Sequence, residues 1–190
     1  MTYINAEDIA AVMRPMLLLA FALASCGPAT EPRGGNDRVT AIFAHGFSRP
    51  IVGPAGNRIG AVKGRPDPQG LIVAFEVSGL SPGTHAVHLT ANGRCDPPDF
   101  ASSGGHWSRP GRLHGTDNPR GPHDGDWDNF DVAADGKGSS ERLIPRWHSP
   151  IPLSGLSMVI HQRADDEVSQ PEGNSGPRIA CAVIIPPARS

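Results

Sequence analysis

Short apolar runs separated by turn residues fill most of the chain, and in several of them hydrophobic and polar positions alternate. Alternation with a period of two is typical of strands that bury one face. No window after the N-terminal segment shows a helical period. The pattern predicts an all-β fold, an eight-stranded Greek-key β-sandwich or flattened barrel with two long functional loops. The expected strands are Arg38–Ala44, Arg58–Val62, Leu71–Ser78, Thr84–Ala91, Asp131–Ala133, Glu141–Ile144, Leu156–His161 and Ile179–Ile185.

Two long segments interrupt this pattern and are the expected functional loops. Residues 93–130 lack regular alternation, and residues 161–177 precede the last strand. A loop of that length in a compact domain usually has a function. The first contains three histidines, several aspartates and a cysteine. A metal ion or a disulfide can hold such a segment in one conformation.

The N-terminal segment indicates export. Met16–Ala24 is apolar but about half as long as a membrane-spanning helix requires. Arg14 precedes it, as in a secretory signal peptide. Leu23-Ala24-Ser25-Cys26 resembles a bacterial lipobox, whose cysteine becomes the acylated first residue of the mature protein. An ordinary cleaved signal with an incidental cysteine is the alternative, and Met13 is a second candidate start.

We therefore expect a lipoprotein signal peptide over residues 1–25, a flexible tether over 26–37 and one folded domain over 38–190. The expected location is the periplasm, lipid-anchored to a membrane through Cys26. Gly27 favours the outer membrane. Three cysteines are an odd number for an exported protein. If Cys26 carries a lipid, Cys95 and Cys181 remain as a pair in an oxidising compartment.

The charge balance narrows the class of partner. Seventeen Lys and Arg residues against nineteen Asp and Glu residues give a formal net charge of -2. No basic stripe dominates the sequence, so a nucleic-acid partner is not expected.

The run Thr84–Ala91 carries two histidines on opposite faces. In a strand, His85 shares one face with apolar residues, and we expect it to be a core histidine bonded to backbone. His88 points the other way, and Thr90 lies on the same face as His88. His161 ends another apolar run and could face the same cavity as His88.

Three histidines and one aspartate in the first loop form a candidate zinc site: His106, His114, His123 and Asp126. Four nitrogen and oxygen ligands suit tetrahedral Zn²⁺, and closed four-ligand sites are typically structural. A solvated polar loop with unrelated histidines is the alternative. Asp165 is a candidate for orienting a ligating imidazole, or else a solvated loop acid like Asp166. His45 and His148 have no partner motif and are expected at the surface.

Several motifs, in order, resemble those of the copper/zinc superoxide dismutases, from about Val39 to Ile185. They are Gly83-Thr84-His85-Ala86-Val87-His88, Gly104-Gly105-His106-Trp107, Leu113-His114-Gly115, Pro122-His123-Asp124-Gly125-Asp126, Met158-Val159-Ile160-His161 and Gly173-Asn174-Ser175-Gly176-Pro177-Arg178-Ile179-Ala180-Cys181.

The resemblance implies a role for each matching residue. His106, His114, His123 and Asp126 would bind zinc, and His106 would also bridge to copper. His88 and His161 would be copper ligands. Arg178 would attract the superoxide anion, Asp165 would link His88 to His114, and Cys95 and Cys181 would form a disulfide.

Thr90 departs from the family pattern, which has a further copper-binding histidine there. A threonine hydroxyl is a poor copper ligand compared with imidazole. We therefore expect weak copper binding and reduced conversion of superoxide to oxygen and hydrogen peroxide, with an intact zinc site. The alternative is a catalytically inactive, zinc-stabilised copper- or partner-binding lipoprotein on the same scaffold.

Overall fold

The computed structural model describes residues 35–145 and 154–188, all within one compact unit, Pro32–Ser190. The predicted signal peptide, Cys26, most of the predicted tether and His148 lie outside the described residues. No helix in the described ranges has the length and apolar character needed to cross a membrane.

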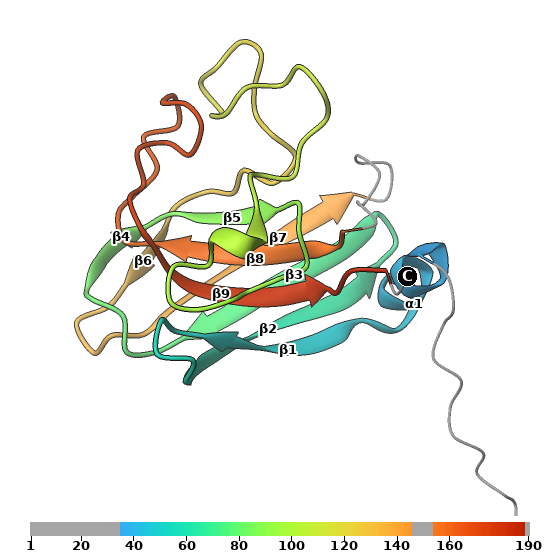
Figure 1. Ribbon diagram of the computed structural model, residues 1–190, viewed down its shortest axis with the longest axis horizontal. Helices are drawn as coiled ribbons and strands as arrows, with labels where there is room; N and C mark the ends of the chain where they lie inside the picture. Colours follow the sequence, from blue (N-terminus) through green and yellow to red (C-terminus); the bar gives the residue numbers. More distant parts are fainter. Residues whose placement is uncertain (1–34, 146–153, 189–190) are drawn as a thin grey trace, which may run out of the picture. The chain divides into compact units, whose positions relative to one another are not determined.

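The described residues form one antiparallel sheet of nine strands that curls into a barrel-like shape (Figure 1). The order in the sheet is β4-β6-β7-β3-β2-β1-β9-β8-β5. The two strands at the ends of this order, β4 and β5, are separated by Ala86 alone. The Ala86 carbonyl accepts from the His161 N–H at 2.9 Å, and the Ala86 N–H donates to the Arg163 carbonyl at 2.9 Å. The sheet is therefore nearly closed on itself. The strands are β1 (Phe47–Val52), β2 (Arg58–Asp67), β3 (Gly70–Val77), β4 (Gly83–His85), β5 (Val87–Thr90), β6 (Phe130–Val132), β7 (Gly138–Pro145), β8 (Leu156–His161) and β9 (Arg178–Ile185).

The all-β prediction is confirmed, and seven of the eight expected strands correspond to observed ones. The expected strand Arg38–Ala44 is wrong, because this segment lies in the helix α1, Gly35–His45. Val39, Ile42 and Phe43 have the i, i+3, i+4 spacing of a helical stripe, and all three pack on the core. The helix also begins within the segment expected to be a tether.

The sequence pattern does not predict the strand β1. Arg49 and Pro50 interrupt its apolar pattern, and a proline is unusual within a strand. Tertiary packing, rather than the local sequence pattern, makes this segment a strand, because Phe47 pairs with Gly64 in β2. A Cβ at Gly64 would lie 2.2 Å from the Phe47 ring, so only glycine leaves room for it.

The core fills the inside of the sheet. Phe75 of β3 packs edge-on against Trp127 and Phe130, with ring centroids 5.8 and 4.9 Å away. Trp127 belongs to the segment that leads into β6, so the end of the first long loop is anchored in the core.

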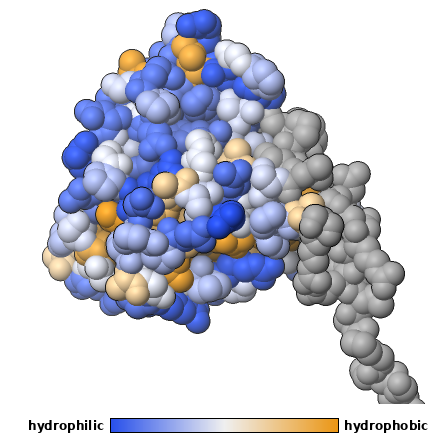
Figure 2. All heavy atoms as spheres, viewed as in Figure 1, coloured by the Kyte–Doolittle hydropathy of each residue, from blue (hydrophilic) through white to orange (hydrophobic). Residues whose placement is uncertain are grey.

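Two long loops, residues 91–129 and 162–177, rise from the same side of the sheet (Figure 1). Their surface in Figure 2 is mostly hydrophilic. Beneath this surface, the buried rings of Phe100 and Trp107 belong to apolar clusters, so apolar packing, polar contacts and a disulfide together order the first loop.

The disulfide expected between Cys95 and Cys181 is present, with the two Cα atoms 5.6 Å apart. It joins the first long loop to β9. The buried side chains of Phe100 and Val159 pack against it. The bond therefore fixes the backbone of the loop near Phe100, next to the start of β9.

Replacing Cys95 and Cys181 together with serine should lower the free energy of unfolding by about 4 kcal/mol, because the bond closes a loop of 86 residues in the unfolded chain. Denaturant unfolding of the metal-free protein measures this. Wild-type protein in a strong reductant should behave like the variant. Equal stability of the variant and the oxidised wild type would contradict the expectation.

Candidate metal centre

Three imidazoles of the first long loop surround one carboxylate oxygen, Oδ1 of Asp126. The Nδ1 atoms of His106, His114 and His123 lie 2.7, 3.0 and 3.3 Å from it. The Nδ1 atoms of His106 and His123 are 3.4 Å apart. Adjacent ligands of a tetrahedral zinc ion lie about 3.3 Å apart. The four side chains that the sequence singled out therefore converge with the spacing of a closed tetrahedral site.

The backbone fixes the Asp126 carboxylate in this position. Its second oxygen, Oδ2, accepts from the N–H groups of Gly115 and His123, each at 2.9 Å. Burial raises the pKa of a carboxyl, but here the hydrogen bonds from the three imidazoles outweigh it and hold the pKa of Asp126 well below its usual range. Asp126 is thus ionised, as a carboxylate ligand of a metal must be.

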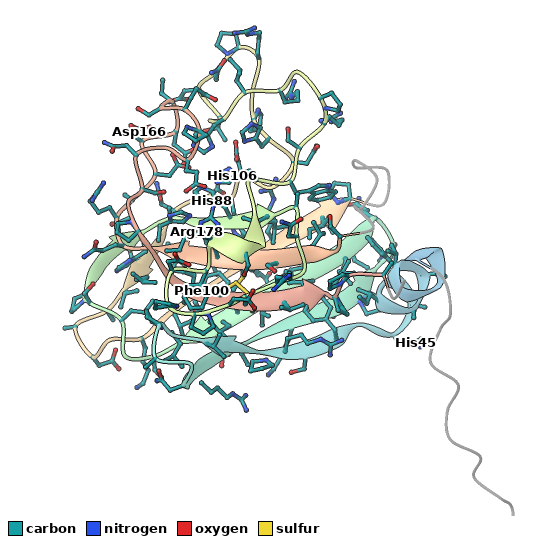
Figure 3. The ribbon with its side chains drawn as sticks, viewed as in Figure 1. His45, His88, Phe100, His106, Asp166 and Arg178 are labelled. Carbon is teal, nitrogen blue, oxygen red and sulfur yellow. A yellow bond between two sulfur atoms is a disulfide. The ribbon has the colours of Figure 1, made fainter. Side chains whose placement is uncertain are left out.

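A second cluster consists of His88 on β5, His161 at the end of β8 and the far side of His106. The strands β5 and β8 are neighbours, with Val87 paired to Ile160. One nitrogen of each ring lies within 4.8 Å of the others. Ring centroids of His88 and His106 are 4.0 Å apart, and those of His88 and His161 are 5.0 Å apart. Figure 3 shows His88 and His106 together below the two loops, close to Arg178.

The second cluster presents three buried nitrogen atoms without a hydrogen-bond partner: His88 Nδ1, His106 Nε2 and His161 Nε2. The other nitrogen of each ring is held. His88 Nε2 lies 2.8 Å from Asp165, His106 Nδ1 faces Asp126, and His161 Nδ1 lies 2.9 Å from the Gly176 carbonyl.

Burial keeps these rings uncharged. It lowers the pKa of His88 to about 3 and lowers the pKa of both His106 and His161. Each ring therefore directs a lone pair into the cluster. A buried polar atom without a partner costs about 1–3 kcal/mol. Neutral imidazoles suit copper, so this donor set fits that metal.

Asp165 connects the two clusters. One oxygen lies 2.8 Å from His88 Nε2 and the other 2.9 Å from His114 Nε2. Hydrogen bonds from the two rings, together with the Glu167 N–H, outweigh burial and hold the pKa of Asp165 below its usual range. For His114, burial lowers the pKa, but its bonds to Asp126 and Asp165 raise it to about 10. Asp165 is buried between these two rings, where it could orient both of them, whereas Asp166 is an exposed loop acid.

Two amide side chains missed by the sequence reasoning hold this arrangement in place. Asn129 accepts from the Asp165 N–H and donates to the Asp165 carbonyl, at 2.7 and 2.9 Å. Gln170 makes the same reciprocal pair with the backbone of His114, both bonds being 2.9 Å. The partners are 36 and 56 residues apart along the chain, so no local spacing could have revealed them.

Thr90 is completely buried and lies opposite His106 in an isolated bridge. Its hydroxyl donates to the Ser157 carbonyl on β8 at 3.3 Å. The second cluster, which Thr90 adjoins, contains three imidazoles and no fourth histidine, cysteine or carboxylate ligand among the described residues. His45 lies on α1, away from the site (Figure 3).

His85 is a core histidine, as predicted. Its side chain is buried, and its two ring nitrogens lie 2.8 and 2.9 Å from the carbonyl oxygens of His161 and Ser81. His85 thereby supports the backbone of His161, a member of the second cluster.

Arg178 begins β9 beside the second cluster. Its Nη1 donates to the Phe100 carbonyl at 3.2 Å and to Ser103 Oγ at 2.8 Å. Its Nη2 forms an ion pair with Glu172, a residue that the sequence reasoning did not single out. The guanidinium is therefore held by the disulfide-anchored loop on one side and by the second long loop on the other.

Sequence relatives cover nearly the whole chain. Residues 59–184 match the copper/zinc superoxide dismutase family (SODC). The superoxide dismutase-like protein YojM of Bacillus subtilis is 31% identical over 190 residues, covering 90% of this chain and 93% of that protein. A copper–zinc superoxide dismutase of Deinococcus radiodurans is 34% identical over 186 residues, with the same two shares covered.

Solved structures agree in fold. A superoxide dismutase-like protein from Bacillus subtilis, crystallised as a double mutant with tyrosine and proline each changed to histidine, gives a TM-score of 0.67 at 34% identity, over 72% of this chain and 95% of that one. The Cu/Zn superoxide dismutase of Brucella abortus gives 0.57 at 28% identity, over 74% and 99%. Since the family match extends from β2 to β9 and includes both long loops, this chain belongs to the copper/zinc superoxide dismutase family.

Proposed function

We propose that this protein is a superoxide dismutase-like metalloprotein with an intact zinc site and an incomplete copper site. The observation that supports this most directly is the set of three buried, unpartnered imidazole nitrogens beside a complete four-ligand cluster. His106 belongs to both clusters. The proposed reaction is the conversion of two superoxide anions and two protons to oxygen and hydrogen peroxide.

The zinc ion would be held by His106, His114, His123 and Asp126. All four positions of a tetrahedral ion are then filled by protein, which is typical of structural zinc. Its role is to order the first long loop and to orient His106.

Copper would be held by His88, His106 and His161, and would supply one-electron redox chemistry. The protein's own contribution is positioning. Asp165 orients His88, the Gly176 carbonyl orients His161, and burial keeps bulk water from the rings. Arg178 would provide the positive charge that attracts a superoxide anion when its ion pair with Glu172 is open.

Thr90 reduces this activity, in our proposal. Its hydroxyl proton is used in the bond to Ser157, and its side chain is shorter than an imidazole. Copper is left with one imidazole fewer than the family pattern, so both its affinity and its redox potential differ.

The alternative function that we propose is that of a catalytically inactive, zinc-stabilised protein that binds copper or a partner. Thr90 favours it, as does Glu172, because its carboxylate already neutralises Arg178. For either function we propose a periplasmic protein anchored by a lipid on Cys26, in the outer membrane.

Replacing Thr90 with histidine should raise copper affinity by roughly tenfold or more and speed superoxide decay, because an imidazole ligand is added. Metal content and superoxide decay are measured after loading with zinc and copper. Thr90→Val is the matched control. It removes the hydroxyl without adding a ligand and should bind copper like the wild type.

Two outcomes would change this view. If the wild type and Thr90→His bind copper equally and remove superoxide at equal rates, the copper site of the wild type is not impaired. If wild type is inactive with copper bound while Thr90→His is active, the alternative function holds.

Replacing Asp126 with asparagine should weaken zinc binding by roughly tenfold to a hundredfold, because a charged ligand is lost. Excess zinc should raise the Tm of the wild type clearly and that of the variant much less. The control is Asp135→Asn, since Asp135 is exposed in a turn near β7. An equal zinc-dependent rise in all three proteins would place the zinc elsewhere.

Replacing Cys26 with serine should move the protein from the membrane fraction to the soluble periplasmic fraction, because no lipid can be attached. Fractionation of expressing cells, with palmitate labelling, measures this. Cleavage of the signal with unchanged location in the variant would favour an ordinary signal peptide.

A further inference from the structure

Arg178, a cationic side chain beside the second cluster, is already paired. Arg178 has an exposed fraction of 12%, and Glu172, its ion-pair partner, has 30%. The remaining donors of Arg178 reach the Phe100 carbonyl and Ser103 Oγ. The guanidinium therefore has three protein acceptors, and one of them is a carboxylate.

The backbone holds Glu172 in position for this pair. Its carbonyl oxygen accepts from the Ser175 N–H at 3.3 Å and from Ser175 Oγ at 2.6 Å. The next residue, Gly173, donates its N–H to the Ser169 carbonyl at 2.8 Å and accepts from the Asp166 N–H at 2.9 Å. Glu172 thus projects from an ordered turn, whereas its side chain retains contact with solvent.

Glu172 also acts on the cluster itself. Burial lowers the pKa of His106 and of His161, and the negative charge of Glu172 partly opposes that lowering in both rings. The carboxylate therefore lies within electrostatic reach of two of the three imidazoles as well as of Arg178.

We infer that Glu172 is a built-in competitor for small anions at Arg178, which weakens the entry of superoxide and of other monoanions to the copper site. This inference rests on the proposed function, because it concerns the regulation of the same site. An unpaired guanidinium attracts an incoming anion over several ångströms, whereas a closed ion pair has no net charge and attracts it little. An anion must displace the carboxylate, which is exposed enough to turn toward solvent.

The experiment compares azide binding to the zinc- and copper-loaded wild type with that of Glu172→Gln. The dissociation constant is obtained from the absorption and electron paramagnetic resonance changes of the copper. Glu172→Gln should bind azide roughly threefold to tenfold more tightly, and its affinity should depend more strongly on salt.

Glu167→Gln is the matched control. It lies in the same loop and changes the net charge equally, but its carboxylate pairs with Thr116 Oγ1 at 2.7 Å. Its azide affinity should equal that of the wild type. In an Arg178→Gln background, the gain from Glu172→Gln should disappear, since the two residues act as a pair.

Three results would overturn the inference. These are an unchanged azide affinity in Glu172→Gln, an equal gain in Glu167→Gln, and a loss of copper from Glu172→Gln, which would make Glu172 a ligand instead. If the wild type takes up no copper, the proposed function fails but the inference is still tested. In the zinc-only protein, phenylglyoxal should then modify Arg178 faster in Glu172→Gln, as mapped by peptide mass spectrometry, and an equal rate would overturn it.

Discussion

Three imidazole nitrogens buried without a protein partner are the constraint on which the rest of this structure depends. Each would be unfavourable in the interior by about 1–3 kcal/mol if nothing bound it. Their rings do not turn to find partners, because the opposite nitrogen of each is tied to Asp126, Asp165 or the Gly176 carbonyl. The fold thus maintains a donor set that could hold a metal ion.

The supporting contacts come from elements far apart in the sequence. The nearly closed sheet brings His88 on β5 next to His161 on β8. Asp126 gathers the imidazoles of the first long loop, and Asp165 ties that loop to the second. The disulfide joins the first loop to β9, the strand that begins at Arg178. The two long loops are held in this way by polar contacts around the site and by the disulfide.

Local patterns in the sequence predict part of this fold. Alternation located the strands that flank the site, and it placed His88 and Thr90 on one face. It failed at Arg38–Ala44, whose apolar residues have helical spacing and pack against the sheet. Residue type and clustering indicated the candidate zinc ligands, whereas family resemblance assigned the copper ligands and the bridging role of His106. Asn129, Gln170 and Glu172 escaped both approaches, because their partners are set by how two loops meet.

Anomalous diffraction at the zinc and copper edges, on a crystal grown with both metals, tests the central claim most directly. We expect a zinc peak among His106, His114, His123 and Asp126, and a copper peak contacting His88, His106 and His161, with Thr90 still bonded to Ser157. Copper bound to a different set of side chains, or no copper at those three imidazoles in the presence of excess metal, would contradict the assignment.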